Sequence, residues 1–218
     1  VEIFLAAGAD PDLVDRPIPL GGGQRTALYF AARAGNQKIV SLLLAAKADV
    51  NIVTFDEGTT ALGCVVLSGH MKLTMQLLKA GANPDLAHKS NGINALHMAC
   101  TDRQKKLVPL LLDAGANVNA QSNTGATPLM LALWQRQPEI VTALLKHGAN
   151  VRLKDNDGMT ALMWAVIGGR EDLLNGVLKA GAEVNAKDNE GCTALDFAIR
   201  DRKRDLQTLL IKAGGKSR

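Results

Sequence analysis

Apolar residues recur at helical spacing in short paired segments, and residues 121–150 show this pattern most clearly. The segment opens with a polar turn that contains a glycine, followed by Thr127 and Pro128, residue types that favour the start of a helix. Apolar residues then repeat at helical spacing and predict a short first helix. A second apolar stripe over 140–145 predicts another helix, which Gly148 ends. Each unit is therefore a helix, a turn, a second helix and a loop.

The same unit repeats along the chain every 33 or 34 residues. The residue types that begin its first helix stand at Thr26, Thr60, Asn94, Thr127, Thr160 and Thr193. A fixed period of this size indicates stacked units, each too small to bury its own apolar face. We therefore expect one repeat array over 1–218. Its expected parts are a partial repeat with an inserted loop at 1–25, full repeats at 26–59, 60–93, 94–126, 127–159 and 160–192, and a C-terminal capping repeat at 193–218.

The composition fits thin helical layers. Hydrophobic residues make up 47% of the chain and aromatic residues only 3%, so the core must be built from Leu, Ala, Val and Ile. The formal net charge of +4 is spread along the chain, which favours a solvated surface over a tract that binds polyanions. No apolar run approaches the roughly 20 residues that a membrane-spanning helix needs, so we expect no membrane insertion.

The cysteines indicate a reducing environment. Cys64, Cys100 and Cys192 are odd in number, widely spaced and set in apolar stretches. This pattern favours reduced core residues over disulfides or metal ligands, and it predicts an intracellular, cytoplasmic protein. The chain opens at Val1, inside a predicted helix, and we expect it to be a fragment from which a targeting signal could have been removed.

Motifs that resemble chemical sites fail at essential positions. The segment 214–217 resembles the end of a phosphate-binding loop, but residue 210 is Leu where that motif needs Gly. The segment 155–158 resembles part of a calcium loop, but Leu153 and Trp164 would stand at two essential ligand positions. The histidines show no metal-ligand spacing; they are His70, His88, His97 and His147. We therefore predict no catalytic residue, no metal site and no cofactor.

The repeat resembles the ankyrin repeat. The best matching segments are Asp155-Asn156-Asp157-Gly158-Met159-Thr160-Ala161-Leu162, Leu67-Ser68-Gly69-His70 and Leu111-Leu112-Asp113-Ala114-Gly115-Ala116-Asn117-Val118-Asn119. The resemblance covers nearly the whole chain and implies an all-α repeat solenoid of six helix pairs, preceded by an outer helix over 1–7. It also implies β-hairpin-like loops that project from the helices. In this family the inner helices and the loops line a concave surface that binds other proteins.

Several residues depart from the family pattern. Pro109 falls inside a predicted helix over 104–114 and should remove a hydrogen bond and bend it. Gly176 weakens the helix expected over 172–180. Lys47 replaces a helix-ending Gly and must become left-handed or end the helix differently. His97 is interpreted as a helix-bracing residue. The Pro- and Gly-rich insertion over 15–23 is either part of a binding face or a drifting loop.

The repeat register identifies candidate contact residues. The position seven residues after each helix start should be exposed, and the position just before each start lies at the base of a loop. Apolar residues at these positions are Leu67, Ile93, Trp134, Met159 and Ile167, and basic ones are Arg25, Arg33 and Arg200. Trp134 is interpreted as a partner contact in preference to packing between repeats, because exposed Trp residues often dominate interface energies. Trp164, at a different register position, is expected in the core.

The resulting hypothesis is a non-enzymatic, monomeric scaffold that binds a partner protein or peptide on the concave face. The partner would present an apolar segment flanked by acidic residues. The alternative is the targeting or regulatory domain of a larger multidomain enzyme, channel or effector. Nucleic-acid binding is less favoured because the basic residues of 200–218 are interrupted by Asp201 and Asp205 and lack stacking aromatic neighbours.

Overall fold

The computed structural model describes residues 1–15, 25–54, 59–102 and 104–218 and contains thirteen α-helices in these parts. Instead of strands, the described residues form two isolated bridges, Val14 with Thr26 and Lys154 with Thr160. The chain divides into two compact units, Val1–Asn117 and Val118–Arg218. The predicted insertion over 15–23 lies outside the described residues except for Asp15.

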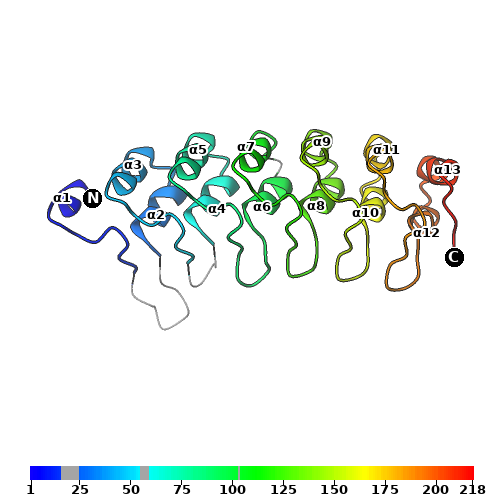
Figure 1. Cartoon of the computed structure of the whole chain (residues 1–218), viewed down its shortest axis with the longest axis horizontal. Coiled ribbons are helices and arrows are strands. Elements are labelled where there is room, and N and C mark those ends of the chain that lie inside the picture. The colour runs from blue at the N-terminus through cyan, green and yellow to red at the C-terminus, as the bar shows by residue number, and fades with distance from the viewer. Residues whose placement is uncertain (16–24, 55–58, 103) are drawn as a thin grey trace. The chain divides into compact units, whose positions relative to one another are not determined.

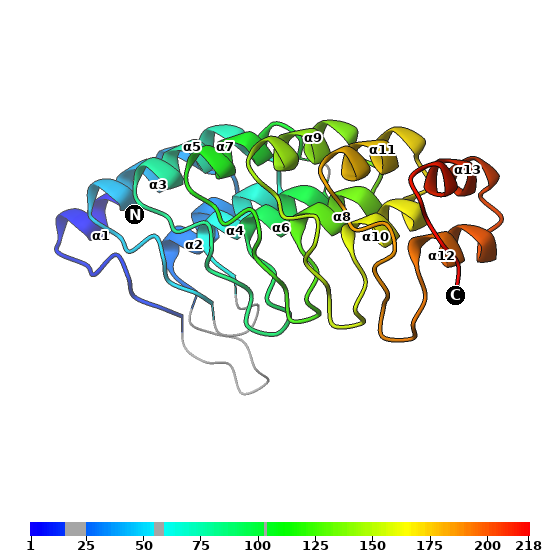
Figure 2. The ribbon, with the colours of Figure 1, turned by 45° about the vertical axis from the view of Figure 1, so that its right-hand side comes forward.

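The first unit consists of a lone helix followed by three helix pairs. Its helices are α1 (Glu2–Ala6), α2 (Ala27–Arg33), α3 (Gln37–Ala45), α4 (Ala61–Leu67), α5 (Met71–Lys79), α6 (Ala95–Thr101) and α7 (Leu107–Asp113). The inner helices α2, α4 and α6 form one row and the outer helices α3, α5 and α7 form another (Figure 1). The loop between α5 and α6 extends from the inner row to one side (Figure 2).

The second unit repeats this arrangement with three further pairs. Its helices are α8 (Pro128–Trp134), α9 (Pro138–Lys146), α10 (Ala161–Gly168), α11 (Glu171–Lys179), α12 (Ala194–Arg200) and α13 (Arg204–Lys212). Here α8, α10 and α12 are the inner helices, and α10 packs against both of the others. The six pairs and the preceding outer helix confirm the repeat organisation predicted from the sequence.

The inner helices begin where the sequence predicts, and for all of them except α10 the N-cap side chain accepts a bond from a backbone N–H group of the first turn. The Thr26 hydroxyl accepts from the Tyr29 N–H at 3.1 Å, and the Thr60 hydroxyl accepts from the Gly63 N–H at 3.2 Å. Asn94 caps α6 in the same way, and the buried His97 ring returns a bond by accepting from the Asn94 N–H. The prediction that His97 braces its helix is therefore confirmed.

The core lies between the rows of inner and outer helices. Leu residues such as Leu43, Leu77 and Leu144 are almost completely buried. Cys64 and Cys100 are buried and form no disulfide, as predicted, and burial raises the pKa of the Cys100 thiol well above its ordinary value. The prediction that all three cysteines lie in the core is wrong for Cys192. It is only half-buried, because it lies just before the α12 N-cap, at the base of a loop.

Lys47 and Pro109 both depart from the repeat pattern, and the structure shows how the backbone accommodates each of them. Lys47 adopts the left-handed conformation at φ 63°, so its N–H still bonds the Leu44 carbonyl at 3.0 Å, as Gly81 bonds Leu78 one repeat later. The prediction for Pro109 is wrong. Its helix begins at Leu107 and not at 104, which places Pro109 in the first turn. Backbone N–H groups there have no acceptor within the helix, so the proline removes no helical hydrogen bond.

Side-chain amides join successive repeats at the start of several loops. The Asn51 side-chain oxygen Oδ1 accepts from the Asn83 backbone N–H at 2.8 Å, and the side-chain nitrogen Nδ2 of Asn51 donates to the Gly81 carbonyl at 3.2 Å. Asn185 makes the same two bonds, to the Lys216 N–H at 2.7 Å and the Gly214 carbonyl at 3.0 Å. Each such amide thus ties the backbone of one repeat to the helix end of the next.

Arg152 occupies the position of Asn185 in the preceding repeat and makes half of this connection. Its Nε donates to the Gly181 carbonyl at 3.3 Å, but a guanidinium cannot accept a bond from the Glu183 N–H. We expect Arg152→Asn to supply the missing acceptor and raise the free energy of unfolding by about 1 kcal/mol in urea denaturation. The reverse change, Asn185→Arg, should lower it. A loss of stability in Arg152→Asn would contradict this account.

Two helical glycines should respond oppositely to alanine. A Cβ at Gly176 in α11 would only touch the Leu145 side chain, at 4.0 Å, whereas one at Gly168 in α10 would collide with the Leu133 carbonyl oxygen. Gly176→Ala should therefore stabilise the protein by about 0.5–1 kcal/mol, because alanine favours the helix. Gly168→Ala is the matched control and should destabilise it. Thermal and urea unfolding measure both, and equal effects would refute the packing argument.

Candidate interaction surface

The predicted contact residues of the first unit differ in their exposure. Leu67 is 46% exposed at the end of α4, and Ile93 is half-buried just before the α6 N-cap. Arg33 is exposed at the end of α2, while Arg25 is half-buried with its guanidinium carbon 6.0 Å from the centre of the Phe30 ring. The exposed positions expected for Leu67 and Arg33 are confirmed, although exposure alone does not establish a partner contact.

In the second unit, Trp134 meets another tryptophan on the surface. Trp134 is 49% exposed at the end of α8, as predicted. Its ring centre lies 6.4 Å from that of Trp164, and the two planes are inclined at 72°, an edge-to-face arrangement. The prediction that Trp164 belongs to the core is wrong, because it is only half-buried. Residues at its register position vary in the first unit, where Phe30 is 44% exposed but Cys64 and Met98 are buried.

Asp155 fixes both Trp164 and the loop beside it. The Trp164 Nε1–H donates to Asp155 Oδ2 at 2.8 Å. The other oxygen, Oδ1, accepts the N–H groups of Asp157 at 3.1 Å and Met159 at 2.9 Å. The buried carboxylate therefore holds an indole and a loop tip together. In the sequence, Asp155 was considered only as part of the calcium-loop-like segment 155–158. The sequence does contain a signal for this additional role: Asp155 lies shortly before the start of an inner helix, and Trp164 follows it by nine residues, inside that helix.

Met159 and Ile167 lie in the same repeat as Trp164, and both are half-buried. Met159 stands at the base of the loop, and Ile167 lies near the end of α10. Lys203 Nζ donates to the Val166 carbonyl at 2.8 Å and to the Ile167 carbonyl at 3.1 Å, which ties this helix end to the next repeat. We call Trp134, Met159, Trp164 and Ile167 the Trp134 face.

The next loop forms a cavity of about 310 Å³ with the adjoining inner helix. It is lined by Asp157, Met159, Asp188, Asn189, Glu190, Phe197 and Arg200. Arg200 is exposed, as predicted, and its guanidinium carbon lies 4.6 Å from the centre of the Phe197 ring. Its Nε also donates to Asp201 Oδ1 at 3.1 Å, so part of its charge is compensated within the chain.

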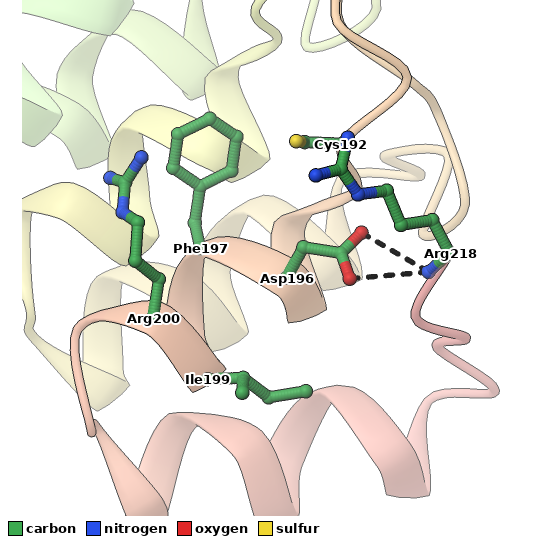
Figure 3. Close-up of a pocket in the computed structure, with 6 residues that line it drawn as sticks. All are labelled: Cys192, Asp196, Phe197, Ile199, Arg200 and Arg218. Carbon is green, nitrogen blue, oxygen red and sulfur yellow. Dashed lines mark hydrogen bonds between the residues drawn. The ribbon is translucent and has the colours of Figure 1, made fainter.

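A second cavity, of about 270 Å³, shares Phe197 and Arg200 with the first and is lined by Cys192, Asp196, Phe197, Ile199, Arg200 and Arg218 (Figure 3). Ile199 is 49% exposed, whereas Leu133 and Val166, at the same register position in this unit, are fully buried. The Asp196 carboxylate accepts from the Thr193 N–H at 2.8 Å and the Arg218 N–H at 3.1 Å. Partial burial acts to raise the pKa of Asp196, but these hydrogen bonds outweigh it and lower the pKa.

The described residues hold neither a cluster of metal-binding side chains nor a membrane-spanning helix. Within the described parts of the chain, no group of three or more His, Cys, Asp or Glu side chains could hold a metal ion. The helices in these same parts are too short or too polar to span a lipid bilayer. The second unit offers a surface of indoles, aliphatic side chains and loop carboxylates.

Comparison with known proteins identifies the repeat. The family model described as ankyrin repeats (three copies) matches residues 1–86, 63–155 and 147–217. Among solved structures, the ankyrin repeat domain of Bcl-3, described as a unique member of the IkappaB protein family, is 27% identical to this chain. The similarity covers 88% of this chain and 87% of that one, with a TM-score of 0.79. A comparison with curated proteins finds no match.

The lowered pKa of Asp196 predicts a specific acid sensitivity. Because its pKa in the folded protein lies below its unfolded value of about 3.9, the carboxylate contributes stability above that pH. This contribution is lost as the pH falls through the folded pKa. Asp196→Asn should therefore be less stable than wild type at pH ~7, and the difference should shrink by pH ~3 in urea unfolding. A pH-independent difference would contradict the assignment.

Proposed function

This chain belongs to the ankyrin repeat family, and we propose that it is a non-enzymatic interaction module that holds a partner protein against the Trp134 face. Family membership supports a protein-interaction domain. The choice of face depends on a single observation: half of the Trp134 side chain is exposed in a chain whose aromatic content is only 3%. A tryptophan that is fixed in place but open to solvent can bury a large area in a complex at low entropic cost.

The surroundings of Trp134 support this role. Trp164 stands edge-to-face beside it and is held by Asp155, so the Trp134 ring packs against a fixed neighbour. Met159 and Ile167 add apolar surface that is already partly desolvated. A partner residue that packs on this face meets an ordered surface, and the entropy lost on binding is correspondingly smaller. We infer that the partner presents an apolar side chain here.

The first unit would supply additional contacts. Leu67 offers exposed apolar area and Ile93 is half-buried, while Arg33 is exposed and Arg25 is half-buried. Acidic partner residues opposite Arg25 and Arg33 would act chiefly on the association rate and on register. Cys64 and Cys100, which are buried and form no disulfide, fit an intracellular location, with the cytoplasm as the proposed compartment.

Truncation of Trp134 tests the proposal. Trp134→Ala should weaken partner binding by about 2 kcal/mol, roughly 30-fold in Kd, mostly through faster dissociation. The partner is first captured from a lysate with the wild-type chain, identified by mass spectrometry and then titrated in purified form. Stability should change little, because Trp134 is half exposed and supports no buried layer.

The matched control is Ile211→Ala, which removes an apolar side chain that is 60% exposed on the outer helix α13. This change should leave partner affinity unchanged. If Trp134→Ala binds as tightly as wild type, or if it unfolds the chain, Trp134 is not a partner contact and the proposed surface is wrong.

A further inference from the structure

The loops beside the Trp134 face carry a carboxylate at the same register position in two successive repeats. Asp157 and Glu190 each lie three residues before the N-cap of an inner helix, where the preceding loop carries Thr124. Both acidic residues are exposed. Negative charge therefore accumulates along the loop tips of the second unit from α8 towards α12.

Hydrogen bonds between neighbouring loops hold the backbone that carries these carboxylates. The Asn156 side-chain amide donates to the Asn123 carbonyl at 2.8 Å, and the Asn189 amide donates to the Asn156 carbonyl at 2.8 Å. The Asn189 N–H also donates to the Asp157 carbonyl at 2.9 Å. The loop tips form a continuous ladder, so the carboxylates flank a preformed space that a ligand does not have to organise.

This space is the cavity of about 310 Å³ between the loops and α12. Met159 and Phe197 supply its apolar surface, while Asp157, Asp188 and Glu190 contribute carboxylates. Such a combination suits a long basic side chain, whose methylene stem packs on apolar residues while its charged end reaches the carboxylates. An acidic side chain would meet like charges on the loop side of the cavity.

Arg200 is the only cation among the residues that line this cavity, and other cations of the second unit make hydrogen bonds within the chain. Arg200, which also lines it, bonds Asp201 and stacks on Phe197. Lys154 Nζ donates to the Lys187 carbonyl at 2.8 Å, and Lys203 Nζ bonds Asp201 at 3.1 Å. Arg218 donates to the Glu190 carbonyl at 3.2 Å and lines the cavity of Figure 3. Three carboxylates against one guanidinium leave the lining with a negative balance.

We propose that this cavity binds a Lys or Arg side chain of a partner segment whose apolar residue packs on the Trp134 face. This inference depends on the proposed function and specifies the charge of the partner. It reverses the expectation from the sequence that an acidic partner residue lies opposite Arg200. That expectation did not take into account the three carboxylates that line the cavity together with Arg200. The partner of the second unit is therefore an apolar and basic protein segment.

Two synthetic peptides of about twelve residues serve as probes. Both are uncharged at their termini and carry the same central pair of leucines, flanked by three arginines in one and three glutamates in the other. Binding to the whole chain is measured by fluorescence anisotropy of a dye on each peptide, in about 50 mM and about 300 mM NaCl. We expect the arginine peptide to bind at least about tenfold tighter, with the preference falling at high salt because the charges are exposed.

Charge-neutral variants then locate the preference. Asp157→Asn combined with Glu190→Gln should reduce it to within about threefold. The control, Glu171→Gln combined with Asp172→Asn in the first turn of the outer helix α11, removes the same charge and should keep the preference. The proposal is overturned if the glutamate peptide binds equally well, if the arginine peptide shows no binding at about 1 mM, or if both variants lose the preference equally.

Trp134→Ala separates this inference from the proposed function. If it weakens both peptides while neither double variant changes their ratio, the Trp134 face binds partners but the cavity does not select a basic residue. If the double variant at Asp157 and Glu190 removes the preference while Trp134→Ala changes neither affinity, the cavity recognises basic residues as inferred and the proposed function fails instead.

Discussion

A single repeat of this protein cannot bury its own apolar face, and every other feature depends on contact between neighbouring repeats. The inner helices are only seven or eight residues long, too short to be stable alone in water. Packing between successive inner helices removes their apolar residues from solvent, and the core consists of small and aliphatic side chains that permit this close approach. Where the next helix comes closest, as at Gly168 against the Leu133 carbonyl, even one methyl group is excluded.

The same dependence between neighbours produces the ordered surface that recognition requires. Loops normally vary in conformation, yet here Asn156 and Asn189 bond the preceding loop backbone, and Asp155 joins its loop to the Trp164 indole. Stacking therefore fixes side chains that do not belong to the core. The Trp134 face and the adjoining cavity are consequences of this order, and they combine apolar area with carboxylates carried by hydrogen-bonded loops.

Much of the fold was predictable because it depends on residue types that recur at fixed positions. The Thr or Asn starts and the helix-ending residues specify all six helix pairs. The effect of residues that depart from the repeat pattern was harder to predict when it depended on where a helix begins. Pro109 removes no helical hydrogen bond because α7 starts at Leu107. For the candidate surface, periodicity identified Trp134 as exposed. It could not place Trp164, whose half-exposed position depends on a hydrogen bond to Asp155 across nine residues, or show that Arg200 shares a cavity with three carboxylates.

The central claim, that a partner covers Trp134, can be measured directly because the chain contains only two tryptophans. In a Trp164→Phe variant, Trp134 becomes the sole source of indole fluorescence. The account predicts that saturating partner shifts its emission to shorter wavelength and protects it from quenching by acrylamide, since a half-exposed ring becomes buried. Unchanged emission and unchanged quenching, while an independent method shows the partner bound to the same variant, would contradict the account.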